Sequence, residues 1–237
     1  MALPKIGYPT YELELPSTGK TVKYRPFLVK EEKVLLMALE SEDEKQVIGA
    51  VKDLLKNCVI SRIKVDTLPS FDLEYLFLKI RAASIGEVIT LNVTCLDDNE
   101  TKVEAQININ DVEVVKPKGH NSKIMFDDTT GIIMKYPSMK QFIDREFLQK
   151  DMNTEQVYDF IAESIDQIFD AEEVYDSTTT TKKEFRTFVD GLTTKQFEKI
   201  QEFYTTAPKL SHDFVVINPK TGKESSYTIE GLQSFFA

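Results

Sequence analysis

The side chains that could perform acid–base chemistry or bind a metal are few, and most of them come as neighbouring acidic pairs. These pairs are Asp97-Asp98, Asp127-Asp128 and Glu172-Glu173. Paired carboxylates can hold a divalent cation or divide the roles of general acid and general base. The first two pairs fall in segments typical of hairpin turns, where an Asp side chain accepts hydrogen bonds from its own backbone. The segment "DDNE" also lacks the length and the glycine of a calcium loop. We therefore expect turn residues here, and no catalytic residue and no metal ligand.

The nucleophilic and metal-binding residue types are equally sparse. His120 and His212 are the two histidines, and neither lies beside a Cys or Ser in a recognisable nucleophile turn. Each is expected to be a surface histidine in a loop or at a strand edge. Cys58 and Cys95 are not spaced as a metal site, and Cys58 ends a helical pattern, so it is expected to be a small buried apolar residue. Two unpaired cysteines and no signal-peptide pattern favour a reducing cytoplasm during synthesis. No cofactor is expected.

The stretch "LPSTGKT", residues 15–21, resembles two known signals and fulfils neither. A P-loop requires a glycine at position 14, where this chain has Glu14, and it requires a helix after Thr21. A sortase signal of the L-P-x-T-G type works near a C-terminus and is followed by an apolar span, yet no run here approaches the roughly 18 apolar residues of a membrane helix. Alternating residues on both sides indicate a β-hairpin whose loop contains Pro16 and Gly19.

Composition limits the partners that this chain can have. It has 237 residues and a formal net charge of −10, with 41% hydrophobic and 29% charged residues. This length allows one large domain or two small ones with an ample core. Neither half offers a basic footprint, which argues against direct binding of nucleic acid, and an acidic surface disfavours anionic membranes.

The hydrophobic patterns predict an α+β fold with three parts. The first part has the N-terminal hairpin and amphipathic helices over residues 28–40, 43–59 and 68–84, the last with Ser70 as N-cap and Gly86 at its end. The middle is antiparallel β, with strands over 87–95 and 101–109 around the turn "LDDNE" and further strands within 112–126 and 131–137. The second half is mostly helical, over 138–150, 153–169, 177–192 and 193–208, and it ends in a hairpin around "NPKTGK". Both long turns are expected to be exposed.

Two regions follow from these patterns, residues 1–118 and residues 119–237, which can also form one integrated domain. The boundary is placed in 116–122, because Pro117, Gly119 and Asn121 interrupt regular structure there.

The end of the sequence is apolar. Leu232, Phe235 and Phe236 follow the last hairpin, and three such side chains left in water would favour aggregation. We predict that they form an anchor that packs either on this chain or on a partner protein. They are the partner-binding residues that the sequence proposes.

Three longer stretches resemble a known family. They are "YRPFLVKEEKVLLMALES", "LPSFDLEYLFLKIRAASIGE" and "NPKTGKESSYTIEGLQSFF", and the most specific parts are Arg25–Lys33 and Leu68–Arg81. Together they resemble the baseplate hub proteins of T-even-type contractile-tailed phages, namely hub subunits and hub assembly proteins, over nearly the whole chain. The resemblance carries no catalytic residue. Several relatives have paired cysteines near the position of Cys95, whereas this chain has one, so the resemblance transfers no zinc site.

The resemblance implies a structural or assembly component of the baseplate hub that is made in the host cytoplasm and acts by binding other hub proteins. Two alternatives stay open. One is a cell-wall hydrolase that uses paired carboxylates, one of them with a raised pKa, in a cleft that fits a sugar. The other is a chaperone that assists tail assembly and then leaves.

Overall fold

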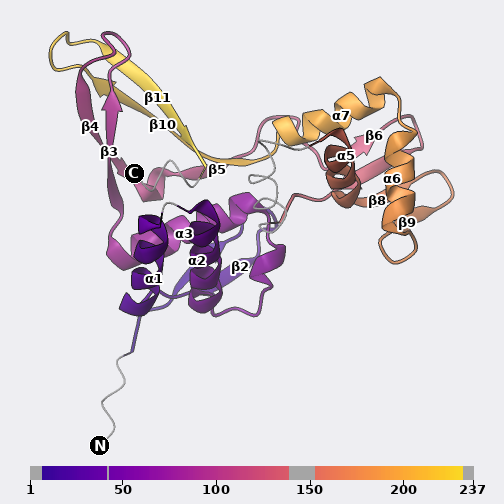
Figure 1. Cartoon of the computed structure of the whole chain (residues 1–237), viewed down its shortest axis with the longest axis horizontal. Helices are drawn as coiled ribbons and strands as arrows, with labels where there is room; N and C mark the ends of the chain where they lie inside the picture. The colour runs from indigo at the N-terminus through magenta and orange to yellow at the C-terminus, as the bar shows by residue number, and fades with distance from the viewer. Residues whose placement is uncertain (1–6, 42, 139–152, 232–237) are drawn as a thin grey trace, which may run out of the picture. The chain divides into compact units, whose positions relative to one another are not determined.

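The computed structural model describes residues 7–41, 43–138 and 153–231. It is an α+β protein whose strands form small antiparallel sheets, as the sequence predicts. The chain divides into two compact units: unit 1 contains residues 1–115 and 209–237, and unit 2 contains residues 116–208 (Figure 1). Within the described residues, no helix is both long enough and apolar enough to cross a membrane.

Unit 1 begins with the predicted hairpin and three helices. Strands β1 (Tyr11–Glu14) and β2 (Thr21–Tyr24) pair in antiparallel register. They are followed by α1 (Val29–Glu40), α2 (Glu44–Cys58), the short 3-10 helix η1 (Val65–Thr67) and α3 (Ser70–Ile85). α3 is buried on most of its circumference, which includes the predicted Leu73, Leu76, Phe77 and Ile80.

The loop over "LPSTGKT" is structural. Gly19 has a φ of +67° and its N–H donates to the carbonyl of Leu15 at 2.8 Å, which closes the turn. Ser17 donates from its backbone N–H to Asp72 Oδ1 at 3.0 Å, and its hydroxyl donates to the other carboxylate oxygen. Thr21 begins a strand, not the helix that a P-loop requires. The stretch therefore fastens the first hairpin to the first turn of α3.

One detail of α3 differs from the sequence prediction. The N-cap position is Pro69 rather than Ser70, which is the first helical residue, and no side chain caps this end. The pyrrolidine ring fixes φ near the value that this position needs, so proline can start the helix without a capping hydroxyl. Gly86 ends the helix with a φ of +117°, as expected.

The rest of unit 1 consists of two long hairpins. Strands β3 (Val88–Thr94) and β4 (Lys102–Asn108) form one. Strands β10 (Lys209–Ile217) and β11 (Glu224–Glu230) form the other, and β10 also pairs with β5 (Glu113–Val115), which follows the 3-10 helix η2 (Ile109–Asp111). The predicted division of the chain assigns the last hairpin to the second region, residues 119–237. In the structure its pairing with β5 makes it part of unit 1.

Apolar side chains from both long hairpins share a core with α3. The cluster contains Leu78 of α3, Ile89 and Leu91 of β3, Ile107 of β4 and Leu210 of β10. A second cluster nearer the hairpin ends joins Cys95, Ala105 and Val216. Alternate residues of the strands thus face inward, which fixes the register of both hairpins.

In its described residues, 116–138 and 153–208, unit 2 is a four-stranded sheet packed with three helices. The sheet has the order β6-β7-β8-β9, and all of its pairs are antiparallel. Its elements are β6 (Lys123–Met125), β7 (Gly131–Met134), α5 (Thr154–Glu163), β8 (Ile165–Phe169), β9 (Val174–Asp176), α6 (Lys182–Asp190) and α7 (Thr194–Thr205). Most of the predicted helix over 138–150 lies outside the described residues.

The helix predicted over 153–169 is wrong in its second half. α5 ends at Glu163, and Ile165 and Ile168 belong to β8, where they pair with β7. The Ser164 N–H and hydroxyl both donate to the carbonyl of Phe160 and so complete the last turn. The isoleucines fit a helical spacing by chance, and strand pairing with "GIIM" decides the outcome.

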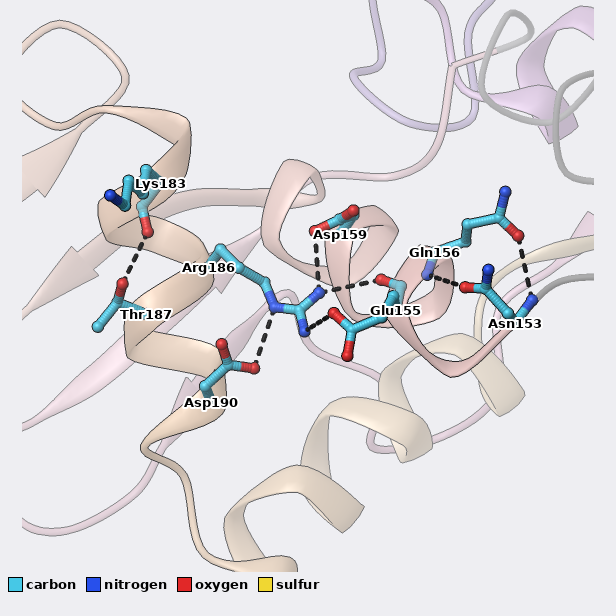
Figure 2. A network of polar contacts seen from close by, with 8 residues as sticks. All are labelled: Asn153, Glu155, Gln156, Asp159, Lys183, Arg186, Thr187 and Asp190. Atoms are coloured by element: carbon cyan, nitrogen blue, oxygen red, sulfur yellow. Dashed lines mark hydrogen bonds and ion pairs between the residues drawn. The ribbon is translucent and has the colours of Figure 1, made fainter.

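A charged network joins α5 to α6. Figure 2 shows the Arg186 guanidinium between three carboxylates, those of Glu155 at 2.8 Å, Asp159 at 2.9 Å and Asp190 at 3.0 Å. The guanidinium also lies over the ring of Tyr158, 5.0 Å from its centroid. This network connects structural elements of unit 2 and leaves no free charge on Arg186 for a ligand.

Candidate interaction surface

The Arg25–Lys33 segment contains a buried ion pair. Arg25 and Glu31 are 7% and 6% exposed. Arg25 Nη2 donates to Glu31 Oε1 at 2.9 Å and Nη1 donates to Oε2 at 3.2 Å, the two-pronged geometry that arginine favours. Burial alone would raise the pKa of Glu31, but the hydrogen bonds from Arg25 and from the Leu28 N–H outweigh it and hold the pKa below its usual value. Both charges are satisfied inside the unit.

The same carboxylate sets the start of α1. Glu31 Oε2 accepts from the Leu28 N–H at 2.5 Å, where Leu28 is the N-cap residue and Glu31 is the third residue of the helix. This is the return half of a capping box, and it satisfies a donor that the helix itself cannot. The ion pair therefore fixes both the first residue of α1 and the face that the helix turns inward.

The opposite side of α1 is apolar and exposed. Val29, Leu36 and Met37 lie at i, i+7 and i+8, a spacing that puts them on one side of a helix, and they are 81%, 52% and 58% exposed. Val34, also exposed, lies one turn before Met37, whereas Leu35 and Ala38 face the core. We call Val29, Val34, Leu36 and Met37 the α1 outer face. A contiguous apolar surface of this kind marks protein–protein contact sites.

Two lysines border the α1 outer face. Lys30 lies 3.7 Å from Glu31, whose carboxylate is already bound to Arg25. Lys33 has no ion pair within the described residues. Glu32 and Glu40 lie at i−4 and i+4 from Leu36, so the charges around this helix face are of both signs. The face therefore suits a partner surface that is apolar and has charges of both signs around it.

The ends of the two long hairpins are fastened to each other. The buried Asn218 amide donates to Asp97 Oδ1 at 2.9 Å and to Asp98 Oδ2 at 3.0 Å, and the Thr221 hydroxyl donates to Asp97 Oδ2 at 2.5 Å. The Leu96 N–H donates to the hydroxyl of Ser225 at 3.1 Å. Most residues of both turns are exposed as expected, but Asn218 and Cys95 are buried, because these contacts hold the bases of the turns together.

Asp98 and Asp127 serve the turns that contain them, as the sequence predicts. Asp98 accepts from the N–H groups of Glu100 and Thr101 and from the Thr101 hydroxyl, and these bonds hold its pKa far below the usual value. Asp127 accepts from the N–H groups of Thr129 and Thr130, which lower its pKa. Glu172 and Glu173 donate their N–H groups to Asp170. Within the described ranges, no group of three or more His, Cys, Asp or Glu residues is arranged to hold a metal.

The prediction of a surface histidine is wrong for His120, which is 8% exposed. Its Nδ1 lies 2.9 Å from the Thr206 hydroxyl and its Nε2 lies 2.8 Å from the Tyr136 hydroxyl, and its ring stacks on Tyr136 and Phe203. The Thr206 hydroxyl already donates to the carbonyl of Glu202 at 2.7 Å, so it accepts from Nδ1–H, and Nε2 then accepts from Tyr136. The pocket is built for the neutral ring.

A pH dependence of unit 2 follows from this pocket. Burial, with a smaller effect from Lys116, lowers the pKa of His120 below its ordinary value of 6.5. The neutral His120 ring therefore stabilises folded unit 2 fully above pH 6.5. This stabilisation is lost as the pH falls toward the lowered pKa, because His120 binds the proton more readily in the unfolded chain. We expect the hydrogen-exchange protection of Ile200 and Phe203 to fall between pH 7.5 and 5.5. His120→Gln should flatten this slope and His212→Gln should keep it; an unchanged slope in His120→Gln would contradict the assignment.

The remaining predicted residues are accounted for as follows. His212 lies on β10, partly exposed, with its Nδ1 3.3 Å from the carbonyl of Asp111. Cys58 is buried as predicted, and burial raises the pKa of its thiol to about 11. Cys95 is buried in the hairpin core. Leu232, Phe235 and Phe236 lie outside the described residues, so their role as an anchor stays a prediction.

The α1 outer face is the feature that sequence reasoning missed. For residues 28–40 the sequence pattern predicts only an amphipathic helix. A signal was present, because "VLLMALE" places apolar residues around more than half of the helix, which is more than one buried stripe requires. The sequence alone does not show which of those residues face the core. The buried position of Glu31 in the structure shows which side of α1 is turned inward.

Comparison with known families gives one match. The model of the family described as "T4 bacteriophage base plate protein" matches residues 8–237. Comparisons with curated proteins and with solved structures give no match. The matched range includes the ion pair, the α1 outer face and both long hairpins. On this evidence the chain belongs to the T4-type phage baseplate protein family, whose members are components of the phage tail.

Proposed function

We propose that this chain is a structural or assembly component of the baseplate hub, the central part of a contractile phage tail, and that it acts by protein–protein interaction. The observation that carries the proposal is the α1 outer face, which exposes four apolar side chains within the stretch "YRPFLVKEEKVLLMALES" that resembles hub proteins. Full burial of each such side chain is worth about 1.5–3 kcal/mol, enough to make this face the main contact. The partners are other hub proteins, and neither nucleic acid nor a membrane is involved.

The polar features of the segment support this role. Arg25 and Glu31 neutralise each other inside the unit and orient α1. The charges beside the α1 outer face on this helix are Lys30 and Lys33 together with Glu32 and Glu40. An apolar centre with a charged rim is the usual anatomy of a specific interface. A neighbouring protein that offers apolar side chains with charges of both signs around them would complete it.

The hydrolase alternative lacks support in the described residues. It needs a carboxylic acid of raised pKa beside an ionised one at a surface that a sugar can reach. Burial raises the pKa of Asp72, but this side chain is fully buried and accepts two hydrogen bonds from Ser17. Asp98 and Asp127 have lowered pKa values because their own turns donate hydrogen bonds to them. We therefore propose no enzymatic activity.

The second alternative is an assembly chaperone that leaves the tail. The number of copies of this protein in each virion distinguishes such a chaperone from a permanent subunit. Quantitative mass spectrometry of purified virions, calibrated on a tail-tube protein, measures that number directly. We expect a small and fixed number of copies per virion, because the α1 outer face needs a permanent partner to stay out of water. Complete absence from virions, with presence in assembly intermediates, would instead establish the chaperone role.

Leu232, Phe235 and Phe236 are proposed as an anchor that packs either on this protein's own unit or on another hub protein. Deletion of residues 232–237 should lower the melting temperature of the isolated protein if this segment packs on its own unit. The same deletion should leave the melting temperature unchanged and prevent tail assembly if the segment packs on another hub protein.

A further inference from the structure

β3 occupies the edge of a sheet but has the sequence of an internal strand. Its residues, V-I-T-L-N-V-T, include no charge, no proline and no glycine. It pairs with β4 without interruption from Val88↔Asn108 to Thr94↔Lys102, so no bulge distorts it. Among the described strands β4 is its one hydrogen-bonded neighbour, which leaves the other edge of β3 unpaired.

The other edge strands of the described chain are protected in the usual way. Lysine, glutamate or aspartate on an edge strand discourages a further strand from pairing with it. Such residues are Glu12 on β1, Lys23 on β2, Lys102 on β4, Glu113 on β5, Lys123 on β6, Asp176 on β9 and Glu224 on β11. The described strand that shares the uncharged composition of β3 is β7, and β7 lies between β6 and β8.

The position of β3 within unit 1 keeps this edge available. Ile89 and Leu91 are buried in the core shared with α3 and β10, so the strand cannot turn over. Its alternate residues Val88, Thr90 and Asn92 are exposed, with Val88 at 57%. A long, uncharged and regular edge strand is a ready template for strand addition.

We propose that the free edge of β3 binds an extended segment of another protein as an additional β-strand. The segment is uncharged in its middle and carries Lys or Arg at both ends, because Glu87 precedes β3 and Asp97 follows it closely. A second copy of this chain would bring Glu87 near a second Asp97 and is disfavoured by like charge. This surface is separate from the α1 outer face, and its test does not require the hub assignment.

The test uses a synthetic strand as the probe. The full chain is titrated with the peptide acetyl-Lys-Thr-Val-Thr-Val-Thr-Val-Lys-amide, and backbone hydrogen exchange of residues 88–94 and 102–108 is followed together. Saturable binding is expected, with exchange slowed for the β3 amides that do not already donate to β4. The same peptide with proline at its fourth position should not bind, since proline removes a main-chain donor.

A matched pair of variants locates the binding edge. Thr90 and Gln106 face each other across the hairpin, and both are exposed. Thr90→Lys places a charge on β3 and should weaken peptide binding by about tenfold, which corresponds to about 1.4 kcal/mol. Gln106→Lys makes the same charge change one strand away and should alter binding by less than about twofold. Hydrogen exchange of Leu78 confirms that both variants remain folded.

Three results would overturn the proposal. The first is no saturable binding, and the second is equal binding of the proline peptide. The third is protection that appears on β11 or β4 instead of β3. Dimerisation of the peptide-free protein that Thr90→Lys abolishes would show that the occupant is a second copy and would also contradict the partner proposed here.

Discussion

The Arg25→Met variant is expected to lose about 3–5 kcal/mol of folding free energy in unit 1, a large part of the stability of an ordinary domain. The substitution removes the two-pronged partner of the Glu31 carboxylate, which is 6% exposed, and leaves the exposed Lys30 ammonium 3.7 Å away as its nearest cation. Urea unfolding followed by hydrogen exchange of α3 amides measures the loss. Exchange in the β7 and β8 amides of unit 2 should change little.

A double variant tests whether the loss comes from the unpaired charge. Arg25→Met with Glu31→Leu replaces both partners by apolar side chains and should recover most of the lost free energy, as is common for buried ion pairs. Recovery will be incomplete, because Glu31 also accepts from the Leu28 N–H at the start of α1. A single variant that loses less than about 1 kcal/mol would show that the pair is solvated and does not orient α1.

The Leu36→Asp/Met37→Asp variant is expected to fold normally and to abolish tail assembly. Both side chains are more than half exposed, so the free energy of unfolding should change by about 0.5 kcal/mol or less. Two carboxylates in the centre of an apolar contact should weaken binding to the partner by at least about a hundredfold. Complementation of a phage that lacks this protein, scored by infectious particles, measures the effect.

The control is Val215→Asp, which introduces a charge at an exposed valine on β10 of the same unit. Its melting temperature and its complementation should both stay near those of the unmodified protein. Normal complementation by the Leu36→Asp/Met37→Asp variant would rule out the α1 outer face as an essential contact.

The sequence predicts those elements in which local signals and tertiary contacts agree. Clear alternation gives the hairpins β3–β4 and β10–β11, and the positive φ of Gly86 ends α3 where the pattern does. The region 153–169 fails because Ile165 and Ile168, three residues apart, fit a helical stripe, whereas a regular strand would put them on opposite faces. The pairing of β7 with β8 has a register shift between Ile133 and Met134, which the local pattern does not encode. Only the pairing of β8 with β7, across more than thirty residues, decides between helix and strand.

The candidate site is harder to predict for a different reason. Asp98 and Asp127 could be assigned to turns because each aspartate and the N–H groups that it accepts from lie within a few residues. The burial of His120 depends on Tyr136, Phe203 and Thr206, and the contact of Asn218 with Asp97 spans 121 residues. Likewise, which side of α1 is exposed depends on the ion pair of Glu31 with Arg25, which no periodicity encodes.

The central claim is that this baseplate protein works through contact of its α1 outer face with another hub protein. Site-specific photo-crosslinking in assembled tails tests it most directly, with the photoreactive residue placed at Met37 and, as the control, at Val215. The account predicts a single crosslinked partner from position 37, identified by mass spectrometry as another hub protein of the same tail, and little or no product from position 215. Tails that contain the protein but give no product from position 37, or the same products from both positions, would contradict it.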